Sequence, residues 1–582
     1  MKFHLKILLN FVFLFSSFVF SQILTTGSLN GVVSGNNGDN LEGANVIATH
    51  TPSGVSSGAT TRSDGSFNIP NLKVGPYMVK VSYIGFSDGE ASSIMIGLGE
   101  DKTLNFTLSS EAIEMAGLDV VADRSANTTG SGSQHNEEAI NNMPTVERGM
   151  YDVAKLNPYV IEGSSGEVNI AGKHPNYNTV KIDGAVLNDV FGLADNGLPG
   201  DQAGSQPISL DAIEEIQVSV SPFDVRQHGF TGGALNAVTR SGSNKFSASA
   251  YMYTKNESSI GDFVEEDGAV NEYPEFSENI YGVRVGGPIM KDKMHYFVNV
   301  ESSNKVTPNT VTITPDKAQS YTGGVDIVRV DSILTNVYGI ETGGYSDPID
   351  AETPSLKLLL KLDYNLSAKH RLSFRHNMVN ATDDINARST GNFYFGKAGY
   401  VFNHTQNSSM LHLYSTLNNK MSNEFTFGYT TIRDSRENGS PDVPSFNIGY
   451  WAATAGAEQY SIGNRLDQDI LQISDNFTYY LNQSHTLSAG FSLENYSFLN
   501  GFFRNFNGLY YYANEDDLLN GTSYGYELTY SAIDDTPQPF AEMSSSLLGF
   551  YAQDQWKVSD QLKLTTGLRL DLPMFPDNPA RN

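Results

Sequence analysis

The sequence predicts a mainly β protein with an N-terminal β-sandwich, a compact α+β unit and a C-terminal antiparallel β-barrel that crosses a membrane. The barrel is predicted from long runs in the C-terminal half that alternate apolar and polar residues, as strands with two different faces do. It is also predicted from unequal connections, because short polar turns and long acidic or glycine-rich segments both join the strands, as in outer-membrane barrels.

The alternation is clearest in residues 356–364, where leucines and a tyrosine share one face and two lysines and an aspartate share the other. Residues 486–494 and 562–570 alternate in the same way, so these strands should have one apolar and one wet face. A large soluble β-sandwich or propeller is the alternative. That alternative does not explain the aromatic strand ends, which suit an interfacial girdle: Tyr479, Tyr480, Tyr551 and Trp556.

Residues 1–21 have the features of a secretory signal peptide. Lys2 and Lys6 both precede the apolar run of residues 7–20, and Ser21-Gln22 is a plausible cleavage point. A buried hydrophobic helix is the alternative reading of this run, which is too short to span a membrane. We therefore expect the mature protein outside the cytoplasm, and the sequence contains no other apolar run long enough for a transmembrane helix.

The composition excludes several classes of function. The chain has no cysteine, which excludes a disulfide framework, a thiolate metal site and a cysteine nucleophile. Its formal net charge of −28 argues against a nucleic-acid partner, because phosphate contacts need basic patches. The sequence contains neither HExxH nor EF-hand spacing, and its 11 histidines are scattered. We therefore predict no enzymatic activity, no catalytic residue, no metal site and no cofactor.

Residues 22–108 contain short β-rich runs separated by turn residues, including a hairpin signal at residues 63–65. The order of these runs resembles the carboxypeptidase regulatory-like (transthyretin-like) domain in the segments GVVSG, LEGANVIA, TTRSDGSFNIPNLKVGPYMVKVSYIGF and TLNFTLS. The resemblance implies a β-sandwich without catalytic residues of its own.

A second resemblance covers the α+β unit, residues 135–245, and the barrel region, residues 246–582. Residues 168–193, 207–253 and 281–301 resemble the TonB-dependent outer-membrane receptors of the Oar-like branch. The resemblance implies that the α+β unit is a plug inside the barrel, in the outer membrane of a Gram-negative bacterium. It further implies energised uptake of a ligand, driven by the TonB protein of an inner-membrane complex.

The same resemblance implies a structural role for a set of residues in the plug. Most are glycines, which permit close approach and unusual dihedral angles. This plug motif comprises Gly172, Asp183, Gly184, Gly229, Gly232, Gly233 and Asn236. Residues 229–244 are expected to be the last piece of the plug, and residues 245–253 the first barrel strand.

Residues 109–134 form a linker that contains LDVVADRS, a short extended apolar stretch at residues 118–125. This stretch is either one more strand of the sandwich or, by resemblance, the TonB box that TonB grips by strand addition. We predict that the TonB contact comprises Asp119, Val120, Val121 and Ala122. The register of that pairing stays open, because an extra acidic residue and a third valine depart from the commoner TonB-box sequence.

The barrel region of about 340 residues fits about a dozen strands at roughly 9–11 residues for each crossing, whereas a plugged transporter has about 22. We therefore expect this sequence to be an N-terminal fragment whose barrel is incomplete. The ligand is not predicted, because ligand contacts come from variable loops and plug apices. Outer-membrane lipid and a surface lipoprotein are further expected partners. A barrel-anchored surface protein for adhesion or polymer handling is the alternative function.

Overall fold

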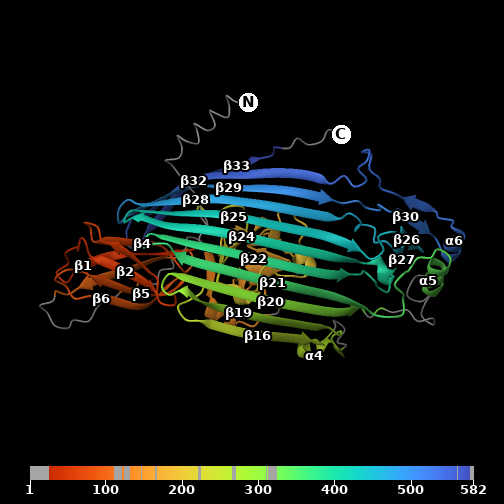
Figure 1. The fold of residues 1–582 in the computed structure, drawn as a ribbon, viewed down its shortest axis with the longest axis horizontal. Helices are drawn as coiled ribbons and strands as arrows, with labels where there is room; N and C mark the ends of the chain where they lie inside the picture. The colour runs from red at the N-terminus through yellow and green to blue at the C-terminus, as the bar shows by residue number, and fades with distance from the viewer. Residues whose placement is uncertain are drawn as a thin grey trace, which may run out of the picture.

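The computed structural model describes residues 25–110, 121–122, 131–145, 147–163, 167–220, 224–264, 270–309, 311, 324–559 and 562–576. A β-sandwich lies at one end of the molecule, and a broad curved sheet wraps around an α+β domain (Figure 1). We call that sheet the wall and the α+β domain, residues 131–239, the plug. The mainly β fold class predicted from the sequence is confirmed.

The sandwich has two four-stranded sheets, with strand orders β4-β1-β7-β8 and β3-β2-β5-β6. Every second side chain of the first strand is buried, so the apolar residues of both sheets share one core. The strands are β1 Gly27–Gly35, β2 Asn45–His50, β3 Ser56–Thr60, β4 Ser66–Leu72, β5 Gly75–Ser82, β6 Gly89–Ile96, β7 Asp101–Leu108 and β8 Val121–Ala122.

The plug is built on a five-stranded sheet of order β13-β12-β15-β14-β9. Its central strand is buried along its whole length, and the small residues of GALNAVT suit a strand covered on both faces. The strands of this sheet are β9 Ser131–Asn136, β12 Thr179–Ile182, β13 Ala185–Val186, β14 Ile213–Val220 and β15 Gly233–Thr239, and a separate two-stranded sheet comprises β10 Val160–Glu162 and β11 Val168–Ile170. The helices are α2 Glu137–Asn142, α3 Met150–Ala154 and the 3₁₀ turns η1 Pro175–Tyr177, η2 Asp201–Ala203 and η3 Leu210–Ala212.

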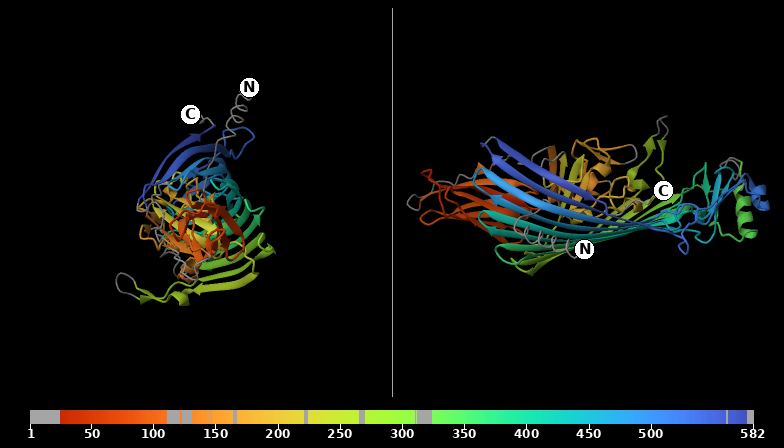
Figure 2. Two further views of the ribbon diagram at one scale, coloured as in Figure 1. Left: turned by 90° about the vertical axis from the view of Figure 1, so that its left-hand side faces the viewer. Right: turned by 90° about the horizontal axis from the view of Figure 1, so that it is seen from above.

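The wall is an eleven-stranded antiparallel sheet in which each strand pairs with the next wall strand along the chain. Its edge strands are β16 and β33, and Figure 2 shows how the sheet curves around the plug. The strands are β16 Ser247–Asn256, β19 Ser277–Met290, β20 Met294–Asn309, β21 Ile349–Asn365, β22 His370–Ile385, β24 Tyr400–Asn418, β25 Met421–Asn438, β28 Arg465–Tyr480, β29 His485–Gly501, β32 Ala541–Lys557 and β33 Lys563–Met574.

The two faces of the wall have opposite character, as β21 demonstrates. Its leucine face points away from the plug, and Leu356 is 40% exposed. The polar face of the same strand is buried: Lys357 and Lys361 are 7% exposed and Asp363 is 2% exposed. The alternation predicted from the sequence is therefore present, but the polar face is covered by the plug instead of being wet. An apolar outer face and a polar inner face are typical of membrane barrels.

Connections at the two ends of the wall differ in length, as predicted. Short turns lie at the sandwich end, whereas four long connections at the other end fold together into a lobe with its own apolar core (Figure 1). The sheet of the lobe comprises β23 Phe393–Tyr394, β27 Ala453–Gly456, β26 Ser445–Ile448, β30 Leu509–Tyr512 and β31 Gly525–Glu527, and its helices are α5 Ile327–Asn336, α6 Glu515–Asn520 and the 3₁₀ turn Gly396–Ala398. The connection after β16 holds α4 Glu257–Ile260, β17 Phe263–Val264 and β18 Val270–Asn271.

The predicted signal peptide, residues 1–21, lies outside the described residues. Within the part of the chain that the structure describes, every helix is too short or too polar to cross a membrane.

Arginine in place of Leu358, on the outer face at the middle of β21, should destabilise the folded protein in lipid vesicles by about 2–4 kcal/mol, the range for a cation near the bilayer midplane. Urea titration of the vesicle-bound protein measures this change. Leu528→Arg is the matched control, because Leu528 lies beyond the wall in the lobe connection and is 47% exposed. Equal destabilisation by both substitutions would contradict a lipid-facing wall.

Candidate functional site

Buried charged side chains gather where the plug meets the inner face of the wall. Burying a charge is costly unless an opposite charge or hydrogen bonds compensate for it. Each buried charge on the plug or the wall therefore needs a partner, and several plug charges have their partners on the wall. The charged or polar residues that form this interface on the plug include Asp183, Ser209, Asp211 and Thr239, and those on the wall include Arg284, Glu301, Lys357, Lys361, Arg375 and His412.

Asp183 and Gly184 form a two-residue turn between β12 and β13, in which Ile182 pairs with Ala185. Both turn residues have positive φ, 43° for Asp183 and 81° for Gly184, as a type I′ turn requires. Asp-Gly is a preferred sequence for this turn, because glycine adopts a positive φ without a Cβ clash. The local sequence therefore fixes the turn that places Asp183 at the edge of the plug sheet.

Asp183 is the centre of a first cluster that joins the plug to three wall strands. Its carboxylate accepts hydrogen bonds from the backbone N–H of Thr239 at 2.9 Å and from the hydroxyl of Thr239. It lies 3.4 Å from Nζ of Lys361 in β21 and 3.6 Å from Nε of Arg375 in β22. Nε2 of His412 in β24 lies 2.9 Å from the Asp183 carbonyl oxygen, to which it can donate. We call these five residues the Asp183 cluster.

The electrostatics of the cluster keep Asp183 ionised. Burial raises the pKa of this carboxyl group, but Lys361, Arg375 and the hydrogen bonds from Thr239 outweigh burial and hold the pKa below its ordinary value. The carboxylate therefore compensates two wall cations, of which Arg375 is only 1% exposed. Removing its charge would leave Arg375 buried without its plug partner, whereas Lys361 would keep its hydrogen bonds to the carbonyl and hydroxyl of Thr239.

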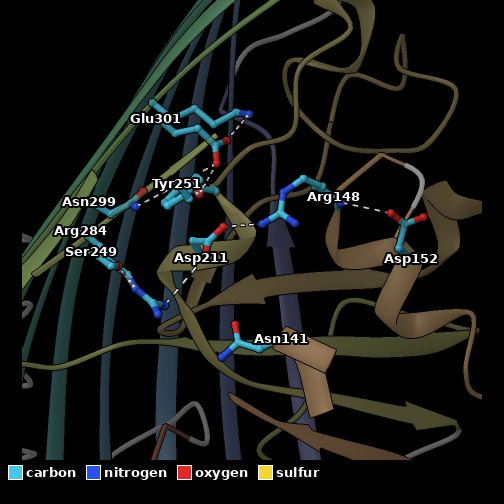
Figure 3. Close-up of polar contacts among 12 residues, drawn as sticks. Asn141, Arg148, Asp152, Asp211, Ser249, Tyr251, Arg284, Asn299 and Glu301 are labelled. Atoms are coloured by element: carbon cyan, nitrogen blue, oxygen red, sulfur yellow. Dashed lines mark hydrogen bonds and ion pairs between the residues drawn. The ribbon is translucent and has the colours of Figure 1, made fainter. Parts of the chain in front are cut away.

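A second cluster joins the plug to β16, β20 and β21 (Figure 3). Glu301 accepts hydrogen bonds from the Ser209 hydroxyl at 2.7 Å and from the Tyr251 hydroxyl at 3.1 Å, and Nζ of Lys357 lies 3.1 Å away. The Asn299 side-chain amide donates to the Tyr251 hydroxyl at 3.2 Å. Ser209 thus connects the plug to a carboxylate that the wall already neutralises.

Asp211 extends the second cluster toward β16 and β19 (Figure 3). Its carboxylate pairs with Arg148 of the plug and lies 3.8 Å from Arg284 of the wall. Nε of Arg284 donates to the Ser249 hydroxyl at 2.8 Å, and the Arg148 guanidinium lies 3.7 Å from the centroid of the Tyr253 ring. The plug is therefore bound to the first wall strands by charge pairs and by a cation–π contact.

Two wall amides reach the plug backbone farther along the sheet. The backbone N–H of Val186 donates to Gln472 of β28 at 3.1 Å, and that of Val225 donates to Gln553 of β32 at 3.1 Å. Arg569 of β33 donates to the Val225 carbonyl at 3.3 Å, so polar contacts between plug and wall extend from β16 to β33.

The plug motif predicted from the sequence is distributed around the plug sheet. Gly233 donates its backbone N–H to Asn178 at 3.0 Å, and a Cβ there would lie 2.3 Å from a methyl group of Ile170, so the position requires glycine. Asp183 and Gly184 form the turn described above. Gly172 and Gly229 have positive φ in turns, Gly232 lies beside Asn178, and Asn236 is buried in β15.

The predicted TonB contact is only partly described. Val121 and Ala122 form β8 and pair with Asn105 and Leu104 at the edge of the sandwich, as the sandwich-strand alternative predicts. The other two residues of the predicted contact, Asp119 and Val120, lie outside the described residues. Contact with TonB stays a prediction, because an edge strand can exchange one partner for another.

Sequence reasoning placed Lys357 and Lys361 on the polar face of their strand but did not identify Glu301, Arg375 and His412 as residues of the wall side. Arg375 and His412 lie at alternate positions of strands whose other residues are mostly apolar or small, a pattern that signals an inward polar side chain once a barrel is assigned. Their plug partners lie far away in the chain, and the sequence contains no signal that pairs them. Among the described residues, no group of three or more His, Asp and Glu side chains could hold a metal ion.

A wall with an apolar outer face and an inner face covered by a separate folded domain defines a plugged outer-membrane β-barrel protein. The family model of the outer membrane beta barrel domain matches residues 238–353 and 334–582, more than half of the chain, and the chain belongs to this family. The model of the carboxypeptidase regulatory-like domain matches residues 28–109. The protein is therefore located in the outer membrane of a Gram-negative bacterium.

The chain is 25% identical over 357 residues to the TonB-dependent transporter Oar of Myxococcus xanthus, which confirms the resemblance seen in the sequence. This alignment covers 57% of the chain and 32% of Oar. The outer membrane transporter YddB from Escherichia coli has a TM-score of 0.55 at 14% identity, and the siderophore receptor PirA from Acinetobacter baumannii has 0.50 at 16%. Both structural matches cover 76% of this chain and 56% of the solved chain, and they establish the fold alone.

Replacing Asp183 with asparagine should weaken the attachment of the plug to the wall by about 3–5 kcal/mol, because it leaves Arg375 buried without an opposite charge and removes the carboxylate beside Lys361. The measurement is the urea concentration at which a protease first cleaves the plug of the folded protein. Asp195→Asn is the control, because Asp195 is an exposed aspartate of the same domain. Identical urea profiles for the two variants would show that the Asp183 cluster does not retain the plug.

Glu215 of β14 generates a pH-dependent prediction where the plug meets the sandwich. Its carboxyl group accepts hydrogen bonds from the Leu98 backbone N–H at 2.8 Å and from the Gln134 amide. Burial raises its pKa to about 7, although these hydrogen bonds lower it, and Glu214 and Glu100 raise it further. The native protein therefore favours the protonated form more than the unfolded chain does, so the contribution of Glu215 to stability is greatest below the ordinary pKa of 4.5 and decreases as the pH rises to about 7.

Glu215→Gln should therefore flatten the decrease in thermal stability between about pH 5 and about pH 7, because glutamine stays neutral. Melting temperatures measured across this range test the expectation. Glu42→Gln, at an exposed position of the sandwich, should keep the pH profile of the unmodified protein. A profile for Glu215→Gln that matches this control would exclude Glu215 as the titrating group.

Proposed function

We propose that the protein is a TonB-dependent outer-membrane transporter, in which a ligand passes along the inner face of the wall after the plug moves. The observation that supports the proposal most strongly is the polar interface between plug and wall. The plug is a folded domain with its own core, and ion pairs and hydrogen bonds attach it to β16, β20, β21, β22 and β24. The proposal includes no enzymatic activity.

A polar interface suits a plug that must move and return. Ion pairs that separate in the presence of water are hydrated, so the cost of breaking them falls once water enters the interface. An apolar interface of the same size would instead expose hydrocarbon to water at about 25 cal/mol for each Å². The Asp183 cluster and the Glu301 contacts therefore hold the plug closed at rest and release it under an applied force.

In this proposal TonB supplies the force through the segment between the sandwich and the plug. Residues 22–108 are the sandwich, residues 109–134 the linker, residues 135–245 the plug and residues 246–582 the barrel region. TonB pairs with Asp119, Val120, Val121 and Ala122 as an added strand. Because Val121 and Ala122 pair with β7 in the resting structure, TonB must replace β7 as the partner of this segment.

Val121→Pro should abolish retention of the periplasmic domain of TonB on the immobilised protein, since proline removes the backbone donor that strand addition needs. Thr128→Pro, in the same linker but outside the predicted contact, should retain TonB like the unmodified protein. Unchanged retention by Val121→Pro, combined with a lower melting temperature of the sandwich, would assign the segment to the sandwich alone.

A surface-anchoring function is the second candidate, and the lobe is the observation that favours it. The lobe has its own core and bears exposed aromatic side chains, including Tyr450 at 71% and Tyr530 at 78% exposure. Such a surface suits adhesion to a polymer or docking of a surface lipoprotein. The TonB experiment separates the candidates, because an anchoring protein does not need TonB contact.

A further inference from the structure

We propose that the sandwich has a further function as a second gate, which caps the periplasmic end of the wall and stabilises the closed plug through the wall residue Asp363. This inference goes beyond the proposed transport and rests on it only for the direction in which the plug moves. The short turns of an outer-membrane barrel lie on the periplasmic side, and the sandwich lies at that end of the wall (Figure 2).

The sandwich contacts the periplasmic end of the wall at well-separated places. Its Arg62 guanidinium donates to the carbonyl of Asn419, in the turn between β24 and β25, at 2.8 Å. The Gln483 amide, in the turn between β28 and β29, donates to the carbonyl of Asp64 at 2.7 Å. A further ion pair joins Asp101 to Lys563 at the start of β33. The contacts therefore span the wall from β24 to β33.

A buried ion pair joins the sandwich to the inner face of the wall. Nζ of Lys73, in the loop between β4 and β5, lies 2.6 Å from Asp363 of β21, and their side chains are 11% and 2% exposed. Asp363 follows Lys361 by two residues on the same face of the strand, so it adjoins the Asp183 cluster. A cavity of about 60 Å³ adjoins all three bodies, with Lys73, Asp183, Lys361 and Asp363 in its lining.

The sandwich also binds the plug directly. Leu98, which is 0% exposed, packs with Val74 of the sandwich and Val238 of the plug. Its backbone N–H donates to Glu215, and its carbonyl accepts a hydrogen bond from Gln217 at 3.1 Å. The sandwich therefore contacts plug and wall at the same time. We call the contact of Leu98 with Val238, Glu215 and Gln217 of the plug the seam, and it opens when the sandwich leaves the plug.

These contacts couple sandwich docking to plug retention. Along the inner face the charges alternate in sign from Asp183 to Lys361, Asp363 and Lys73. When the sandwich leaves, Asp363 loses Lys73 and is left without its own cation, so it competes with Asp183 for Lys361 and weakens the hold of Lys361 on Asp183. By reciprocity, loss of the Asp183 charge weakens sandwich docking. A force on the linker between the two domains acts on both contacts.

Thiol labelling tests the gate without TonB or a ligand, because the native chain has no cysteine. In the full protein, Leu98→Cys places a single thiol in the seam, and a maleimide should label it slowly while the sandwich is docked. Lys73→Met should speed this labelling by about tenfold or more, because it leaves Asp363 buried without its sandwich partner. Lys73→Arg keeps the charge and should keep the labelling slow.

Lys80→Met is the matched control, since Lys80 is a sandwich lysine in an exposed ion pair with Glu90. It should leave the labelling of Leu98→Cys unchanged. Val79→Cys reports on folding, because Val79 is 0% exposed in the sandwich core and should stay protected in every variant. Asp183→Asn should also speed labelling of Leu98→Cys, as the coupling requires.

Equal labelling of Leu98→Cys in the Lys73→Met and Lys80→Met variants would overturn the gate. So would loss of Val79→Cys protection in Lys73→Met, which would mean that Lys73 stabilises the sandwich and not its docking. Unchanged labelling in Asp183→Asn would overturn the coupling. Unchanged TonB retention by Val121→Pro, which would contradict the transport proposal, has no bearing on these labelling rates, so failure of the gate and failure of the transport proposal are distinguishable.

Discussion

The structure depends on one constraint, which is that backbone N–H and C=O groups in hydrocarbon must be paired with each other. An unpaired group costs several kcal/mol there, so the wall must be a sheet with continuous hydrogen bonding between neighbouring strands. Because side chains alternate along a strand, the same sheet has an outer and an inner face. The leucines of β21 cover the outer face, and the lysines and Asp363 of β21 have to find partners inside.

The plug and the sandwich satisfy the inner face in different ways. The plug provides carboxylates and hydroxyls: Asp183 compensates the wall cations Lys361 and Arg375, and Ser209 donates to Glu301, which Lys357 of the wall already neutralises. The sandwich provides Lys73 at the periplasmic end, where the buried carboxylate of Asp363 requires a positive partner. Polar pairs hold sandwich, plug and wall together, along with apolar contacts of Phe297 and Leu359 with the plug core and of Leu98 with Val238. Domains held in this way can separate and rejoin without unfolding.

The sequence was sufficient to predict the features that local pattern determines. Period-two alternation gave β21 the correct faces, and plug-motif glycines such as Gly184 have the unusual dihedral angles expected of them. Contacts between distant residues were beyond such reasoning. Lys73 looks like a loop lysine in its own segment, and only the fold brings it to Asp363, 290 positions later. The stretch around Val121 fits two roles because strand pairing with β7 and strand pairing with TonB need the same residues.

The distribution of Asp183 contacts over three neighbouring strands has a consequence for how such proteins diversify. A change at Lys361, Arg375 or His412 alters the surroundings of a single turn in another domain, so neither body can drift alone at these positions. Grafting the plug of one relative into the wall of another would therefore succeed only where the charges on the plug match those on the inner face of the wall. Evolution by recombination should exchange plug and wall as one unit, while the outward lobe remains free to vary.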